Sequence, residues 1–499
     1  MAPRKTTEAK GRCVWMVSRE YDGLAGAGGV KDVCRQLAES LAGGGGCRVR
    51  VVLPRYGFMD VQALGFAPLR LPGSPCVDTE TQGLIDTLSL DMNYTGEGRR
   101  ERVGIWHAVR RGVCLYLVEA ERFAEKFGVY TYTAEEEQLR SWQRQGTGHF
   151  DYFAMNILLQ KAALALIMAL GERPEVIHCQ DGHAAVLPAL IREIEGYRQF
   201  FRQTGAVVTI HNAGIGYHQE VVDLPFARAI TGLPAEVVND SLLGTAFDPF
   251  LAAAPYAVLN TVSEQYAREL QETDEDVRTG WLGHQLRLRG VTLAGVTNGI
   301  NPADFNASRG KSLLGLAASY EVARGRLAGK RVCKENLLHS LGTRRKRGRL
   351  AQAGRLALRP DQPLLTFIGR LTAQKGVDIL LACCEDFLRE DVEFQLVVLG
   401  GGDPLLEARL TGLAEAEEFS GRVCFLGGYD QELAMKIYAA GDFFLIPSLY
   451  EPCGLTDYIA QLLGNLPVVH HVGGLVKVLD GQTGFSYRGK GKRVAIEFD

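Results

Sequence analysis

The clearest sign of the fold is the segment Leu364-Leu-Thr-Phe-Ile-Gly-Arg-Leu-Thr-Ala-Gln-Lys-Gly376. An apolar run of strand length enters a loop that ends in glycine, and an amphipathic stretch of helical period follows from Val377 to Arg389. Buried strands separated by helices of this length predict parallel sheets with right-handed crossovers. Because the same alternation recurs nearly everywhere, we predict an α/β protein.

Ten short runs rich in β-branched residues are predicted strands. Five lie in the first part of the chain: Val14–Ser18, Val176–His178, Val207–Ile210, Ala257–Val262 and Gly295–Thr297. Five lie in the later part: Leu364–Ile368, Phe394–Leu399, Val423–Leu426, Phe443–Ile446 and Pro467–His470. The alternation is interrupted between about Asn301 and Pro363. We therefore predict a loose tail (residues 1–12) and two Rossmann-like domains (residues 13–300 and 301–499), with the ligand site in the cleft between the domains.

The composition is that of an ordinary soluble protein. The 499 residues carry a net charge of -3, which argues against nucleic acid as the main partner. No apolar run approaches the roughly 20 residues that span a bilayer, and the polar N-terminus does not resemble a signal peptide. The eleven scattered cysteines favour reduced thiols in a cytoplasmic protein. We interpret the basic run Arg344–Arg349 as a solvated loop.

Three loops of the first domain carry candidate chemistry, because ligands of parallel sheets bind at the carboxyl ends of the strands. The loop Gly23–Val33 is rich in glycine, so its backbone can approach a ligand, and the helix that follows offers free N–H groups to an anion. A tight strand-to-helix turn is the alternative. The loops His178–Ala185 and Thr209–Gly214 each pair His with Asp or Asn. Together they favour a polar pocket for a hydroxyl-rich ligand over histidines with a structural role.

Two loops of the second domain suit a nucleotide sugar. Arg370 and Lys375 lie five residues apart at the end of a strand, and a planar guanidinium with an ammonium suits a diphosphate. A surface salt-bridge pair is the alternative. Glu451 follows another strand, where its carboxylate caps the helix that begins near Thr456 or contacts a sugar hydroxyl.

In this order, the loops resemble those of the bacterial and plant glycogen/starch synthases that use ADP-glucose. The resemblance runs from about Val14 to Phe485, and its most specific pieces are Arg370–Gly376, Gly401–Pro404, Pro447–Thr456 and Gly473–Leu475. It implies a GT-B glycosyltransferase that moves glucose from ADP-glucose to the non-reducing end of an α-1,4-glucan such as glycogen, with retention of configuration. The sequence shows no carboxylate cluster suited to a metal ion, so we expect no metal and no other cofactor.

The resemblance also implies the roles of individual residues. Arg370 and Lys375 would bind the donor diphosphate, and Glu451 would contact the transferred glucose. The remaining catalytic positions are His211, which would face the anomeric carbon, and Asp181, which would shape the glucose site. Tyr429 would stack on the adenine. Further donor or substrate contacts fall on Glu20, Gly28, Gly29, Asp32, Asn212, Asn298, Cys453, Gly454, Leu455, Thr456, Gly473 and Gly474.

Two features depart from the family pattern. The first glycine loop usually carries Lys where this chain has Gly26, and Lys31 and Arg19 are the candidates to replace that charge. The chain also stops at Asp499, several tens of residues earlier than family members, and we expect lower stability or activity from this. Two other functions stay open: a related retaining glucosyltransferase that uses UDP-glucose or a small acceptor, and a weakly active glucan-binding homologue.

Overall fold

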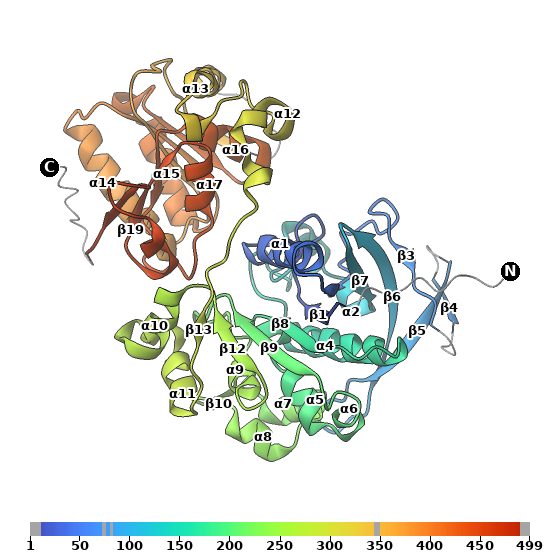
Figure 1. The fold of residues 1–499 in the computed structure, drawn as a ribbon. Coiled ribbons are helices and arrows are strands. Elements are labelled where there is room, and N and C mark those ends of the chain that lie inside the picture. The colour runs from blue at the N-terminus through green and yellow to red at the C-terminus, as the bar shows by residue number, and fades with distance from the viewer. Residues whose placement is uncertain (1–10, 72–75, 80–82, 344–349, 490–499) are drawn as a thin grey trace. The chain divides into compact units, whose positions relative to one another are not determined.

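The computed structural model describes residues 11–71, 76–79, 83–343 and 350–489. The chain divides into two compact units, Met1–Val296 and Thr297–Asp499 (Figure 1). Most of the expected tail (residues 1–10) and the basic run at residues 344–349 lie outside the described residues.

The first unit is built on one mixed sheet, whose eleven described strands run in the order β13-β12-β9-β8-β1-β2-β7-β6-β5-β4, with β3 beside β6. The strands are β1 (Cys13–Val17), β2 (Arg48–Pro54), β3 (Ala67–Pro68), β4 (Cys76–Thr79), β5 (Gly83–Asp91), β6 (Arg100–Arg110), β7 (Val113–Glu119), β8 (Val176–Gln180), β9 (Gly205–Ile210), β12 (Val258–Thr261) and β13 (Ala294–Gly295). A separate pair is formed by β10 (Leu242–Leu243) and β11 (Ala246–Phe247).

The edge of this sheet differs from the parallel arrangement that the sequence predicts. β6 pairs antiparallel with β5 and β7. Between β6 and β7 lie Arg111 and Gly112, both with positive φ (48° and 80°). Two such residues form the tight turn that matches the twist of a hairpin, so the chain reverses here without a crossover helix.

Helices cover the sheet of the first unit. They are α1 (Val30–Gly43), α2 (Glu121–Ala124), α3 (Ala134–Leu139), α4 (Tyr152–Ala169), α5 (Leu187–Glu193), α6 (Glu195–Arg198), α7 (Leu224–Thr231), α8 (Ala235–Asp240), α9 (Pro249–Ala253), α10 (Glu264–Glu272) and α11 (Leu282–Leu288). Within the described residues, α4 alone is long and apolar enough to cross a membrane, and 78% of that stretch is buried inside the unit. It therefore has the character of a core helix.

The second unit contains a sheet of seven described strands in the order β14-β17-β16-β15-β18-β19-β20. All neighbours are parallel except β14 and β17. The strands are β14 (Ala351–Gly354), β15 (Leu364–Ile368), β16 (Gln395–Gly400), β17 (Val423–Gly427), β18 (Phe443–Ile446), β19 (Leu466–His470) and β20 (Phe485–Tyr487). The helices are α12 (Gly310–Leu314), α13 (Ala328–Leu341), α14 (Val377–Arg389), α15 (Pro404–Glu415), α16 (Gln431–Ala440) and α17 (Thr456–Leu462).

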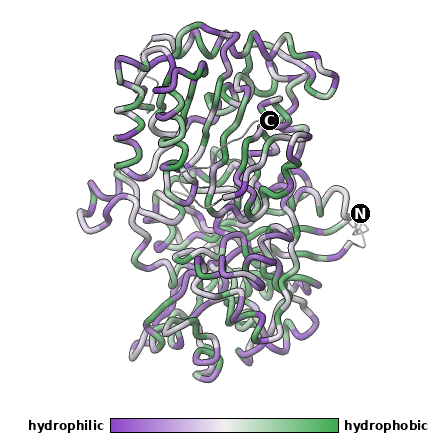
Figure 2. The backbone as a smooth tube through the Cα atoms, turned by 90° about the vertical axis from the view of Figure 1, so that its left-hand side faces the viewer, coloured by the Kyte–Doolittle hydropathy of each residue, from purple (hydrophilic) through white to green (hydrophobic). Residues whose placement is uncertain are grey.

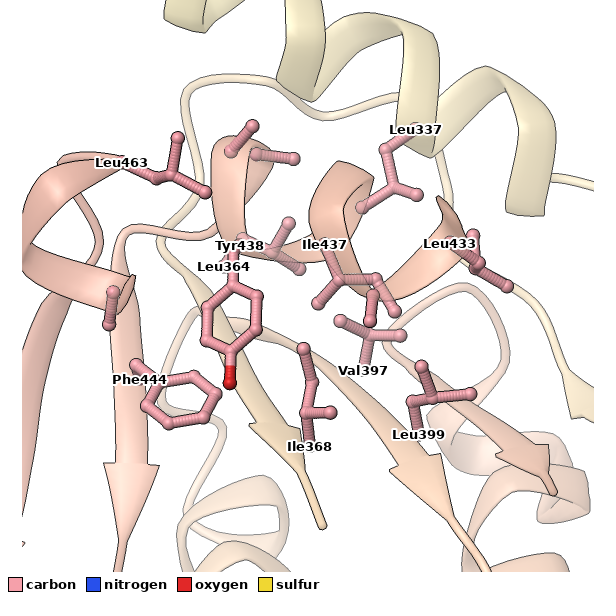
Figure 3. Close-up of a cluster of buried hydrophobic side chains, with 14 of the residues drawn as sticks. Leu337, Leu364, Ile368, Val397, Leu399, Leu433, Ile437, Tyr438, Phe444 and Leu463 are labelled. Carbon is pink, nitrogen blue, oxygen red and sulfur yellow. The ribbon is translucent and has the colours of Figure 1, made fainter. Parts of the chain in front are cut away.

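Alternation along the strands builds a hydrophobic core on each face of this second sheet. Val397 and Leu399 of β16 point to the cluster with α13 and α16 shown in Figure 3, whereas Leu396 and Val398 join the cluster with α14 and α15. Because both faces are covered, the strands are mostly apolar, and hydrophobic colour prevails in the interior of this unit in Figure 2. Each of the ten runs predicted from the sequence overlaps a strand of the structure.

The topology gathers the predicted loops of each unit at one edge of its sheet. In the first unit, β1, β8 and β9 are parallel neighbours, so the loops that follow them leave the same edge. In the second unit, β15, β18 and β19 are parallel neighbours in the same way. Each unit therefore presents its own set of candidate functional residues.

Candidate active-site residues in the two units

Glu20 holds the glycine loop of the first unit in place. Its carboxylate accepts the backbone N–H groups of Ala27 (2.7 Å) and Gly28 (3.1 Å) and the hydroxyl of Tyr130 (2.8 Å). The loop leads into α1, which has no side-chain cap in the described structure and begins directly after Gly29. The helix N–H groups are thus left for another acceptor.

The family pattern has a lysine at position 26, and in this chain the side chain of Lys31 lies over that position. A Cβ at position 26 would collide with the Lys31 side chain, so Gly26 makes room for that chain. The ammonium of Lys31 stays partly exposed and lies 3.7 Å from Asp22. The other candidate, Arg19, is buried and donates to Tyr56, Asn156 and the carbonyl of Val129, so its charge is not available to a ligand.

Asp32 lies beside Lys31 in the first turn of α1. Burial raises the pKa of its carboxyl to about 6.

Asp181 has the most strained backbone of the first unit's predicted site. Its φ of 61° and ψ of -178° fall in a region that is essentially restricted to glycine. The carboxylate accepts the N–H of His211 at 3.3 Å, and burial raises its pKa to about 7. A strained residue is kept only where its surroundings hold it, which makes Asp181 a functional candidate on structural grounds as well.

His211 follows β9 and is buried. Its Nε2 lies 2.8 Å from the side-chain oxygen of Gln180, so this nitrogen carries the proton. Burial lowers the pKa of His211 to about 3, so the ring is neutral near pH 7. The side-chain oxygen of Asn212 accepts the N–H of Gly214 (2.9 Å) within the same loop.

A buried ion pair, not singled out in the sequence, supports the His211 loop. His218 places Nδ1 2.7 Å from Asp248 and Nε2 2.5 Å from the carbonyl of Ala213. Since both nitrogens face acceptors, the ring is an imidazolium. Burial acts to lower the pKa of His218, but the hydrogen bond and charge of Asp248 outweigh it and raise the pKa to about 9.

The second unit pairs Lys375 with Glu451. Lys375 Nζ lies 2.5 Å from Glu451 Oε2, and the hydroxyl of Ser448 donates to the same oxygen at 3.0 Å. Burial acts to raise the pKa of Glu451, but the charge and hydrogen bond of Lys375 outweigh it, and the pKa lies below its ordinary value. A carboxylate and an ammonium are thus fixed together at the ends of neighbouring strands.

The glycines of the second unit bring its loops together. A Cβ at Gly376 would collide with the carbonyl of Pro447, and one at Gly473 with that of Glu451. A Cβ at Gly474 would collide with the carbonyl of Cys453. These glycines let backbone pack on backbone, so the loops after β15, β18 and β19 form one block.

The remaining predicted residues of the second unit lie in or beside this block. Cys453 is buried, its thiol lies 3.9 Å from the carbonyl of Asn298, and burial raises its pKa to about 11. Gly454 (φ 70°) and Leu455 lead into α17, which begins at Thr456. Arg370 is exposed after β15, and Tyr429 is 66% exposed after β17.

Comparisons with known proteins match both units. The model of the "Starch synthase catalytic domain" matches residues 13–286, and that of "Glycosyl transferases group 1" matches residues 349–492. The chain belongs to the starch synthase family. The glycogen synthase of Aeromonas salmonicida is 32% identical over 93% of this chain and 83% of its own length. That of Anaeromyxobacter dehalogenans is 32% identical over 97% of this chain and 88% of its own length.

A solved structure confirms the fold of this starch synthase family member. The catalytic domain of starch synthase IV from Arabidopsis thaliana, bound to ADP and acarbose, superposes with a TM-score of 0.73 and 25% identity, covering 96% of this chain and 89% of its own. The fold is GT-B, and the chain is a glycosyltransferase of the glycogen/starch synthase kind.

The structure adds support residues that the sequence does not reveal. His218 and Asp248 lie thirty residues apart, and only the fold joins them. Lys477 and Asp457 pair in the second unit in the same way. Within the described residues, no three His, Cys, Asp or Glu side chains cluster as a metal ion would require.

Proposed function

We propose that this protein transfers glucose from ADP-glucose to the non-reducing end of an α-1,4-glucan, with retention of configuration and without a metal ion. The Lys375–Glu451 pair carries the proposal, because it fixes a cation for a diphosphate and a carboxylate for sugar hydroxyls in one block of loops. Support comes from the likeness to a starch synthase bound to ADP and acarbose. The ten cysteines whose side chains the structure describes are all free thiols, which supports a reducing, cytoplasmic setting.

In the proposed reaction, the bond between the anomeric carbon and the diphosphate oxygen breaks, and negative charge develops on the departing ADP. Arg370 and Lys375 stabilise that charge, as fixed cations do where water is excluded. The acceptor hydroxyl attacks from the face that ADP leaves, and its proton passes to the departing phosphate. Glu451 binds hydroxyls of the transferred glucose in this scheme, and His211 and Asp181 keep the sugar-binding roles that the family resemblance implies.

Lys31 is our candidate for the cation of the first glycine loop. Its chain lies over Gly26, and its ammonium is partly exposed, whereas Arg19 is buried among neutral acceptors. We therefore expect ADP-glucose binding to survive the replacement of the family lysine by Gly26.

The test is incorporation of labelled glucose into glycogen from ADP-glucose, UDP-glucose and GDP-glucose, each with and without chelator. We expect ADP-glucose to be used best and chelator to have no effect. Preference for UDP-glucose would instead favour the related glucosyltransferase. Co-sedimentation with glucan but no incorporation would favour the glucan-binding homologue. Loss of activity in chelator would overturn metal independence.

A further inference from the structure

Lys477 binds the turn that follows Glu451. Its ammonium donates to the carbonyl of Cys453 at 2.6 Å and to the carbonyl of Gly454 at 2.7 Å. The same ammonium lies 3.2 Å from Asp457 and 4.5 Å from the ring centre of Tyr458. The side chain of Lys477 is 16% exposed and that of Asp457 is fully buried. A buried charge with these contacts is held in one place.

The contact fixes the direction of two backbone amides. The described peptide bonds are all trans, and a trans peptide points its N–H opposite to its C=O. Because both carbonyls point to Lys477, the N–H groups of Gly454 and Leu455 point away from it. Neither N–H donates to an acceptor within the described residues. The turn thus presents two hydrogen-bond donors on the side away from Lys477.

We propose that Lys477 is a positioning residue of the transfer site, which orients the amides of Gly454 and Leu455 toward the donor. The proposal rests on the proposed function for its ligand, a sugar nucleotide. Asp457 balances the charge of Lys477 inside the unit. The neighbouring Gly473–Gly474 turn closes the block, because it packs on the carbonyls of Glu451 and Cys453.

The first experiment measures the turn without any ligand. Cys453 lies in the turn, so its alkylation by iodoacetamide, followed by peptide mapping, reports how firmly the turn is held. We expect Lys477→Met to raise the alkylation rate at Cys453 at least about tenfold. The fully buried Cys179 and Cys424 report the global fold and should stay protected. Lys436→Met, which removes a partly exposed ammonium of the same unit, is the matched control and should leave Cys453 protected.

The second experiment separates positioning from stability. Lys477→Met leaves Asp457 buried and unpaired, which destabilises the fold. Adding Asp457→Asn removes that charge, so the double variant should regain most of the lost melting temperature. Its kcat with ADP-glucose should nevertheless stay about 10–100-fold below the wild type, with KM changed less, because oriented donors act mainly on the transition state.

The outcomes distinguish the two proposals. A double variant that regains both stability and kcat would overturn the positioning role, as would wild-type alkylation of Cys453 in Lys477→Met. If the wild type transfers no glucose but Cys453 is exposed only in the Lys477 variants, Lys477 still holds the turn, and it is the proposed function that fails.

Discussion

The loop His211–Gly214 of the first unit and the loop Glu451–Gly454 of the second unit both follow a parallel strand. In each, a largely buried cation donates to the backbone of the loop, to one carbonyl in the first unit and to two in the second. In the first unit the cation is His218, and its partner Asp248 also accepts two backbone N–H groups, from Phe250 (2.8 Å) and Leu251 (3.1 Å). In the second unit the cation is Lys477, and burial raises the pKa of its partner Asp457 to about 6.

The difference shows how each loop depends on pH. An imidazolium can lose its proton in mild alkali, and the contact with Ala213 then loses its charge. The carboxylate of Asp457 instead gains a proton in mild acid, at a pH where the His218 pair is intact. The two loops therefore have supports of the same design that fail at opposite ends of the pH range.

The first prediction, and the one with the greatest loss of activity, concerns Lys375, the partner of Glu451 in the second loop. Lys375→Ala removes the ammonium that holds Glu451 and, in the proposed reaction, the charge beside the departing phosphate. We expect kcat with ADP-glucose to fall by about two to three orders of magnitude, the usual loss for one group that stabilises transition-state charge. Steady-state kinetics and a melting curve measure this. Lys436→Ala is the control, and a Lys375 variant with wild-type kcat would contradict the phosphate assignment.

The next prediction tests the support of the first loop. The folded-state pKa of His218 is about 9, above the ordinary 6.5, so its stabilisation is fully present below about pH 6.5 and is lost as pH rises through about 9. The difference corresponds to about 3 kcal/mol of unfolding free energy.

Denaturant unfolding at pH 6 and pH 10 measures this contribution for the wild type and for His218→Gln. At pH 6 the variant should be less stable than the wild type. At pH 10 the two proteins should have similar unfolding free energies, because the wild type has lost the contribution of His218. The exposed His339→Gln is the control and should follow the wild type. Equal pH dependence in wild type and His218→Gln would show that the His218–Asp248 pair does not carry the effect.

The sequence predicts the strands that carry the site, because their residues are apolar on both faces and end in glycine or polar loops. It does not reveal His218, Asp248, Lys477 or Asp457 as supports, because a buried pair is recognised only when the fold joins two distant residues. No strand is predicted between Ser18 and Val176, so the sequence analysis misses the antiparallel hairpin at Arg111–Gly112, where only the backbone shows that Arg111 adopts a positive φ.

A third prediction concerns Gly474, a glycine of the second unit that packs on backbone. At Gly474 a Cβ would collide with the carbonyl of Cys453, and backbone cannot move aside as a side chain can. Gly474→Ala should therefore destabilise the second unit by about 2 kcal/mol, in the range of overpacked cores, and should expose Cys453 to alkylation. Denaturant unfolding and peptide mapping measure both effects. Wild-type stability in this variant would show that the loops pack less closely than the structure indicates.

The smallest effect on stability is expected at Gly28. A variant at this position tests whether the first glycine loop contacts the donor or is only a tight turn. In the described structure, nothing lies within 4 Å of a Cβ built at Gly28, and its φ is not positive. Alanine thus fits the free protein, and Gly28→Ala should change the unfolding free energy by less than about 0.5 kcal/mol. If the backbone of this loop approaches the donor, the added methyl group occupies the space of the ligand, and KM for ADP-glucose should rise several-fold. Steady-state kinetics measure KM for ADP-glucose, and denaturant unfolding measures the stability of the same variant. A Gly28→Ala variant with unchanged KM would assign the loop to a tight turn alone and leave the second unit's loops as the sole donor site.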